Sequence, residues 1–371
     1  MPRRPLEILN CFVLATLLVL ALLCEAMGRL HAAPALPLRC EVMLACVLGI
    51  AAIERRRPSF LARPRWLAAV ANIVVDFYPI LLIPLVYDVL GFLIPALNPV
   101  EKDPWLIAAD RAIFGMDPTV WLQRFIWPPL TDLLYLAYAT FFFFPMIVGI
   151  PLWRRSPRLG RRFLFAVSLA FYVSYTGYIF VPAEGPRVGL AAEQTVQLQQ
   201  TRLSKTVAGT LDRLERNRVD AFPSGHILIT SLCLITAARY FRRLFWSLLP
   251  VGLLLMVATV YCRYHYVIDV IAALALAPVV PLAASWLYDR LSNEKPTPQT
   301  PSPRRPQGNP RDGHVGSVEQ QGQRREPGPH WSEVSALRDP GPKDPAWLKV
   351  SSCHSGCSSP FHAGPWDPGL R

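Results

Sequence analysis

Two histidines at the ends of one helical hairpin are the residues best suited to chemistry in this chain. His226 closes the sequence Pro223-Ser224-Gly225-His226 immediately before an apolar run, and His265 stands at the start of another. The run after His226 turns near Arg239 and a second run leads back to His265. This pattern predicts that the two imidazoles meet at one face of a membrane.

His265 and Asp269 are spaced so that their side chains lie on the same face of a helix. A carboxylate there can hold one imidazole nitrogen and leave the other free as a nucleophile or base. The alternative is a capped helix start with a polar pair at the membrane interface.

Ser224 and Gly225 stand where the helix after them begins. Ser224 is a suitable N-cap, and the free backbone N–H groups and helix dipole beyond it form an anion site that suits phosphate. His226, inside the first turn, can then protonate a leaving oxygen as a general acid. The alternative is an ordinary N-cap beside an interfacial histidine.

Arg187 follows Gly185 and Pro186 at the end of another apolar run, which is predicted to end at the same face. A guanidinium there can fork two hydrogen bonds to phosphate oxygens, although a single arginine at this place more often anchors a lipid headgroup. Taken together, the arginine, the Ser-Gly-His helix start and the His-Asp pair form a constellation for phosphoryl transfer.

The elements that carry these residues are predicted to be membrane-spanning helices. The chain of 371 residues is 52% hydrophobic and only 17% charged, with its apolar residues in long blocks, which favours an all-α, polytopic membrane bundle. We expect about eight spans. They are about Leu9–Met27, Cys40–Ile53, Leu67–Pro95, Pro129–Leu152, Phe163–Val181, Ser224–Ala238, Leu244–Cys262 and Tyr266–Leu287. The first is long for a signal peptide, so a transmembrane helix is favoured there.

The net charge of +12 is not read as a sign of nucleic-acid binding, because most arginines lie in short clusters between apolar runs. The clusters follow the second, fourth and sixth predicted spans, which places those loops in the cytoplasm by the positive-inside rule. By the same rule Arg187, His226 and His265 lie on the non-cytoplasmic face, periplasmic or lumenal.

Two stretches of the predicted membrane core contain charged residues. Asp76 and Asp88 fall in the third span, where carboxylates should face the bundle interior or lie near an end. Residues 98–128, with several tryptophans and charges, suit a helix lying in the interface.

The predicted domains are two N-terminal helices (1–66), a membrane core (67–290) containing six of the spans, and a disordered, Pro-rich tail (291–371). Zinc is not expected at Cys353–Cys357, because no second ligand pair follows.

Pro223-Ser224-Gly225-His226 and His265-Tyr266-Val267-Ile268-Asp269 resemble motifs of the type 2 phosphatidic acid phosphatase superfamily. The stretches Val181–Arg187 and Asp110–Gly115 look like the branch that contains inositol phosphorylceramide synthase. The resemblance implies that His265 is the nucleophile, Asp269 its orienting partner and His226 the general acid. It also implies that Ser224 and Arg187 bind phosphate and that no metal or cofactor takes part.

The chain departs from the common family pattern at two positions. Phe180 stands where the first motif has lysine, and Thr259 where the third has arginine, while Arg263 is only two residues from His265. Both changes remove phosphate-binding cations and favour the transferase-like branch.

The function expected from the sequence is phosphoryl transfer from a lipid phosphate or phospholipid headgroup through a phosphohistidine. The acceptor is an alcohol such as inositol or, in a lipid phosphatase, water. Two further alternatives are a catalytically silent lipid-binding protein and, less favoured because only Asp76 is charged in mid-span, a transporter.

Overall fold

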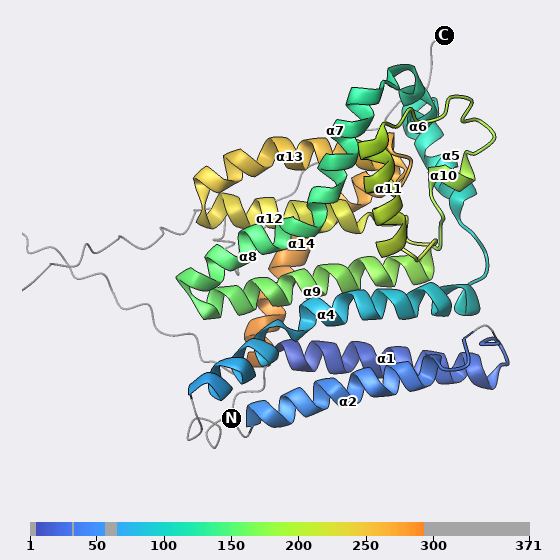
Figure 1. Cartoon of the computed structure of the whole chain (residues 1–371). Helices are drawn as coiled ribbons and strands as arrows, with labels where there is room; N and C mark the ends of the chain where they lie inside the picture. The colour runs from blue at the N-terminus through green and yellow to red at the C-terminus, as the bar shows by residue number, and fades with distance from the viewer. Residues whose placement is uncertain (1–4, 32, 56–64, 293–371) are drawn as a thin grey trace, which may run out of the picture. The chain divides into compact units, whose positions relative to one another are not determined.

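The computed structural model describes residues 5–31, 33–55 and 65–292, and every regular element in these ranges is a helix. The helices are α1 (Pro5–Ala26), α2 (Leu36–Arg55), α4 (Arg65–Leu97), α5 (Asp103–Phe114), α6 (Pro118–Trp121), η1 (Leu122–Phe125), α7 (Pro128–Ala139), η2 (Thr140–Phe143), α8 (Phe144–Arg155), α9 (Pro157–Phe180), α10 (Pro186–Gly189), α11 (Arg202–Leu214), α12 (Gly225–Tyr240), α13 (Arg242–Tyr261) and α14 (Val267–Ser292). Figure 1 shows the long helices running roughly alongside one another.

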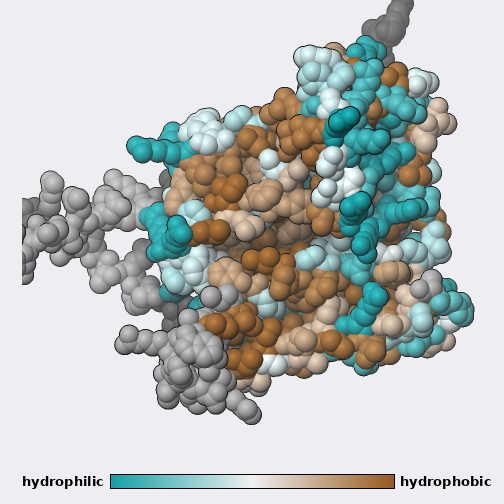
Figure 2. Space-filling model, in the orientation of Figure 1, coloured by the Kyte–Doolittle hydropathy of each residue, from teal (hydrophilic) through white to brown (hydrophobic). Residues whose placement is uncertain are grey.

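Seven stretches of the described chain are long and apolar enough to cross a membrane, one of them formed by α7, η2 and α8 together. The sixth predicted span is α12, which is apolar but has 16 residues and is shorter than these. In Figure 2 hydrophobic residues cover the middle of the helices, and hydrophilic ones gather around α5, α10 and α11. The predicted all-α membrane bundle is therefore confirmed, and the protein is an integral membrane protein.

The N-terminal helix α1 packs against α2 and also against α4, α9 and α14. A buried polar link joins it to the rest of the bundle: Asn10 donates to the Tyr78 hydroxyl at 2.8 Å and accepts from the Tyr172 hydroxyl at 2.7 Å. A polar side chain placed among apolar helices needs such partners. The domain boundary proposed near residue 66 stays a prediction.

Asp76 and Asp88, the two carboxylates in the third span, both have basic partners. Asp76 is buried in α4 and accepts two hydrogen bonds from Arg161 of α9, at 3.1 and 3.3 Å. Asp88 lies 3.2 Å from Arg39 near the other end of α4. Ion pairing therefore accounts for both carboxylates, Asp76 in the bundle interior and Asp88 at a more exposed position.

The helix connections place the arginines and the histidines at opposite ends of the helices. The α8–α9 and α12–α13 turns carry the clusters around Arg155 and Arg242, whereas His226 begins α12 and His265 precedes α14. Arg56, Arg57 and Arg63 of the earlier cluster, the Cys353–Cys357 motif and the predicted tail from residue 293 lie outside the described residues.

Candidate functional site

The start of α12 is fixed by Ser224 and Gly225. The Ser224 hydroxyl accepts the N–H of Ile227 at 3.4 Å, so Ser224 is the N-cap that the sequence predicts. A Cβ on Gly225 would lie 2.7 Å from the Tyr178 hydroxyl of α9, so a side chain there would push the two helices apart. Glycine thus lets α12 begin directly against α9 and fixes the place of the next residue, His226.

His265 has one ring nitrogen occupied and one available. Nδ1–H donates to the Ala221 carbonyl oxygen at 2.8 Å, which leaves Nε2 with its lone pair. Asp269 Oδ2 is 3.5 Å from Nδ1 and accepts the backbone N–H of Tyr266 at 2.8 Å. The backbone of Ala221 is thus the nearer partner that orients this ring, and Asp269 is the adjacent negative charge.

The free nitrogen of His265 faces the second histidine. His265 Nε2 lies 3.3 Å from His226 Nδ1, and both imidazoles are buried. His226 packs against the rings of Phe141 and Tyr138, with centroids 4.2 and 4.5 Å away. Residues that are 39 positions apart in sequence are therefore brought into direct contact, as the helical hairpin predicts.

Glu215, at the end of α11, holds the far side of His226. Its Oε1 is 3.0 Å from His226 Nε2, and its Oε2 accepts from the Tyr138 hydroxyl at 3.0 Å. If both rings are neutral and their outer nitrogens donate to Glu215 and to the Ala221 carbonyl, the two inner nitrogens that face each other would both carry lone pairs. Because two lone pairs repel at this distance, a proton must lie between the inner nitrogens. That proton is held by one of the two facing nitrogens, His226 Nδ1 or His265 Nε2, and the other nitrogen accepts it with its lone pair.

Carboxylates dominate the electrostatics around the pair. Burial disfavours the imidazolium form of His265, but Asp269 and Asp220 outweigh this effect and raise the pKa of His265 above its ordinary value. Burial also raises the pKa of Asp220, which accepts from the Tyr87 hydroxyl at 2.5 Å. The surrounding carboxylates thus favour the imidazolium form of His265.

Two aspartates of α5 tie the surrounding loops together. Asp110 accepts the backbone N–H groups of Val267 and Ile268, at 3.0 and 2.8 Å, and so caps the start of α14. Asp103 accepts the backbone N–H of Gly185 and the Tyr266 hydroxyl, both at 2.8 Å. The region predicted to lie in the interface therefore also anchors the loop that carries His265.

Gly185 marks a close approach between two of these loops. Its φ of 86° lies in the left-handed region, and a Cβ would lie 2.5 Å from the Tyr264 carbonyl oxygen. The backbone N–H of the nearby Arg187 donates to the Arg263 carbonyl at 3.1 Å. These contacts hold the end of the α9–α10 connection against the loop that leads to His265.

Arg187 lies at the histidine end of the helices but is engaged elsewhere. Its guanidinium donates to Asp212 at 2.9 Å and lies 4.3 Å from the centre of the Tyr264 ring. Tyr264 stacks on Tyr138, which in turn contacts His226. Among the described residues Arg187 makes no hydrogen bond or ion pair with either histidine, and the rings of Tyr264 and Tyr138 lie between it and His226.

Neither Thr259, which stands where the third motif has arginine, nor the nearby Arg263 supplies a cation to the pair. Thr259 is buried and its hydroxyl donates to the Met256 carbonyl at 2.7 Å. Arg263 has a φ of 68° and donates to the Val196 carbonyl. Of the six residues predicted to form the site, five converge around the histidines and Arg187 stands apart.

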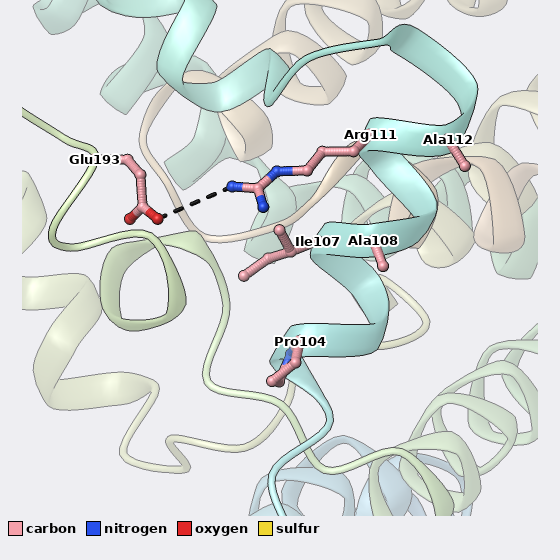
Figure 3. A pocket seen from close by; sticks show the side chains of 6 residues that line it. All are labelled: Pro104, Ile107, Ala108, Arg111, Ala112 and Glu193. Carbon is pink, nitrogen blue, oxygen red and sulfur yellow. Dashed lines mark ion pairs between the residues drawn. The ribbon is translucent and has the colours of Figure 1, made fainter.

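One histidine of the pair, His226, lines a cavity of about 560 Å³, together with Glu215 and Asp220. A second, shallower hollow lies on α5, where Arg111 and Glu193 approach to 3.9 Å (Figure 3). Arg111 also forks two 2.8 Å hydrogen bonds to Asp117, so its charge is already matched. Within the described ranges, no group of three or more His, Cys, Asp or Glu side chains is placed to hold a metal ion.

Sequence reasoning missed several residues that hold the histidines. Glu215 lies in a stretch of mixed charge with no distinctive spacing, and Ala221 acts through its backbone, which no residue type reveals. Tyr138 belongs to an apolar span, where an aromatic residue is usually part of the packing. Asp110 belongs to a stretch noted for its resemblance, although its role as a helix cap was not predicted.

Comparison with known proteins supports the resemblance at the level of the superfamily. Residues 104–283, which include all six predicted site residues, match the family model described as PAP2 superfamily. A PA-phosphatase related-family protein of Dictyostelium discoideum is 23% identical over 189 residues, covering 44% of this chain. The match spans 34% of that relative's length, about a third. No solved structure matches the chain.

Proposed function

We propose that this protein is a membrane-embedded phosphoryl-transfer enzyme that acts on a lipid phosphate or phospholipid headgroup through a phosphohistidine on His265. The observation that carries the proposal is the 3.3 Å contact between His265 Nε2 and His226 Nδ1, with the outer nitrogen of each ring held by a different partner. When the shared proton is on His226, His265 Nε2 presents a lone pair and His226 Nδ1 presents a proton at the same point. A nucleophile and a general acid need this arrangement.

In the first step the phosphoryl group enters between the two nitrogens and takes the place of their direct contact. His265 Nε2 forms a bond to phosphorus as the bond to the leaving oxygen breaks, and His226 Nδ1–H gives its proton to that oxygen. The products are a phosphohistidine and a free alcohol. Glu215 stabilises His226 while the ring carries the proton.

In the second step an acceptor oxygen attacks the phosphohistidine. His226 now takes the proton from water or from an alcohol, the P–N bond breaks, and His265 regains its lone pair. Water as acceptor gives a lipid phosphatase, which the name of the Dictyostelium relative favours. An alcohol such as inositol gives a transferase, which the likeness of Asp110–Gly115 and Val181–Arg187 to the inositol phosphorylceramide synthase branch favours.

Three residues are proposed to bind the phosphate. The helix start at Ser224 and Gly225 places the positive end of the α12 dipole beside it. Arg187 is half-exposed and reaches the substrate by exchanging the Asp212 carboxylate for a phosphate oxygen. Neither the start of α12 nor Arg187 requires a metal ion or a cofactor to bind phosphate.

The active site is proposed to lie on the non-cytoplasmic face. The support is topological, because the arginine-rich α8–α9 and α12–α13 turns are at the helix ends remote from His226 and His265. Labelling of single cysteines introduced near Arg155 and near Arg187, in intact vesicles with an impermeant reagent, tests the orientation. Labelling of the Arg155 side alone from the non-cytoplasmic compartment would contradict it.

The function is tested with the purified full-length chain in detergent and chelator, given a panel of labelled lipid phosphates and phospholipids with or without inositol. We expect phosphate release, or a new phosphodiester lipid that forms only when an alcohol is added. The matched control is His265→Ala, which must lose either product. A wild-type protein that forms no product from any lipid would contradict the proposal and favour a silent lipid-binding protein.

A further inference from the structure

The cavity beside the histidine pair continues as an apolar groove along three helices. Its floor is α9, and its walls are α4 on one side and α8 on the other, each of which packs against α9 (Figure 1). The α9 residues in the lining recur every three or four positions, as one face of a helix does. They are Gly160, Phe163, Leu164, Val167, Phe171, Tyr175 and Tyr178.

The polar groups of this groove are all at one end. His226, Glu215 and Asp220 line it where it meets the candidate site, together with Tyr87 and Phe141. Beyond them the lining is almost wholly aliphatic or aromatic, and it includes residues such as Ile80 and Met146 that are about half-exposed. An apolar cavity with a few convergent polar groups is typical of a ligand site.

The far end of the groove is closed by Trp153 of α8. Its ring lies 4.8 Å from the ring of Phe77, which joins the two walls at that end. A Cβ on Gly160 would lie 2.4 Å from the Trp153 ring, so glycine allows the indole to lie directly against the floor helix. The Arg161 guanidinium, held by Asp76, lies 5.7 Å from the same ring centre. Trp153 is therefore fixed by contacts on three sides.

The length of the groove follows from the helix that forms one wall. Phe141 touches His226 at the polar end, and Trp153 closes the other, twelve positions along η2 and α8. The rises of the two helix types place these residues ~20 Å apart. Because a C–C bond of about 1.5 Å advances an extended chain by ~1.3 Å, the groove matches a chain of about 15 carbon atoms.

We infer that this groove binds one extended apolar chain of the lipid substrate, with its phosphate at the histidine pair, and that Trp153 sets the upper limit of chain length. The inference rests on the proposed function for the phosphate position, and it adds a binding site and a specificity-determining residue. The lipid's apolar chain is already in the apolar membrane before it binds. Its length is therefore selected by its fit against the fixed Trp153 ring rather than by transfer out of water.

The direct test is photocrosslinking of the purified full-length chain with lysophosphatidic acids that carry a diazirine at the end of the acyl chain. The probes span about 10 to about 22 carbon atoms, to bracket the estimated groove length. With a chain of about 15 carbons we expect crosslinks to residues beside Trp153, such as Phe77 and Gly160. Crosslinks confined to the lipid-facing α13, or spread evenly over all helices, would overturn the inference.

Two substitutions change the groove in opposite senses. Trp153→Ala removes the end wall and should move the preferred chain length up by ~4 carbons, about the depth of one ring. Ile150→Trp fills the groove nearer the site and should lower crosslinking of the longer probes about tenfold or more. The matched controls are Trp246→Ala, an exposed tryptophan of α13, and Ile147→Trp, an exposed α8 residue outside the cavity lining.

The two proposals fail in different ways. Crosslinking beside Trp153 by a protein that turns over no phosphate ester supports the groove and removes the enzyme function. Turnover of these probes and of p-nitrophenyl phosphate, with no crosslinking beside Trp153 and no change in chain preference in either variant, supports the enzyme and removes the groove. Ile150→Trp keeps the test valid if Trp153→Ala does not fold, because it leaves the end wall in place.

Discussion

The arginine end and the histidine end of the bundle use carboxylates for different purposes. At the arginine end, Asp76 is paired with the permanently charged guanidinium of Arg161 inside the helices. At the histidine end, Glu215 and Asp269 face imidazoles, which can bind or release a proton. A carboxylate thus forms a structural ion pair where its partner keeps its charge, and we propose that it supports proton transfer where its partner is an imidazole.

The largest loss of activity is expected when either histidine is replaced. His265→Ala removes the proposed nucleophile and should lower kcat by at least about 1,000-fold, and His226→Ala removes the acid and should cost about 100- to 10,000-fold. Steady-state kinetics and circular dichroism on the purified variants check this. Activity near the wild-type value in either folded variant would remove the mechanism.

Glu215→Gln should give the next largest effect. It keeps a side chain that can bond His226 but removes the negative charge that stabilises the protonated ring, so we expect kcat to fall about 10- to 100-fold. The melting temperature should change little. A matched control is Glu193→Gln, on the surface hollow near Arg111, for which kcat should stay unchanged. Equal kcat values for the two variants would show that Glu215 has no part in catalysis.

Asp76→Asn should affect stability rather than chemistry. It leaves the Arg161 guanidinium, which is one third exposed, without its charged partner, so we expect a loss of about 1–3 kcal/mol in the free energy of unfolding. Thermal unfolding in detergent measures this, and kcat of the folded fraction should stay within about twofold. A large fall in kcat with unchanged stability would mean that the two ends are not separate in function.

The smallest effect is expected in the pH profile. The nucleophile must be neutral, so activity should rise with pH through the pKa of His265, which nearby carboxylates raise. Asp220→Asn removes one of these negative charges and makes the imidazolium form less favourable. The acidic limb of kcat/KM should therefore move to lower pH, and a limb that moves to higher pH would contradict the assignment.

Long-range periodicity made most of this fold predictable. Apolar runs located the helices to within a few residues, and the helical hairpin correctly predicted that His226 and His265 meet, although they are 39 positions apart. Asp76 was expected to face the bundle interior or lie near a helix end, because the cost of a carboxylate in an apolar span depends only on residue type. Which partner it has, Arg161, depends on helix packing and was not predictable.

The parts of the site that were missed depend on loop geometry. The backbone carbonyl of Ala221 orients His265, and any residue type at that position would carry the same group. Glu215 reaches His226 only because α11 ends beside α12, and nothing in the spacing of the two residues indicates it. Arg187 shows the opposite case, in which a residue was predicted for the site but has other partners. An arginine at this end of the helices suits phosphate binding, yet its side chain contacts Asp212 and Tyr264.

Trapping the covalent intermediate tests the central claim most directly. The wild-type protein is mixed for a short time with a lipid substrate labelled at phosphorus, quenched in alkali to preserve phosphohistidine, and digested for mass spectrometry. We expect label on His265, its absence in His265→Ala and, where the acceptor is an alcohol, its accumulation when that alcohol is withheld. Turnover of the lipid with label on another residue, or on none, would contradict it.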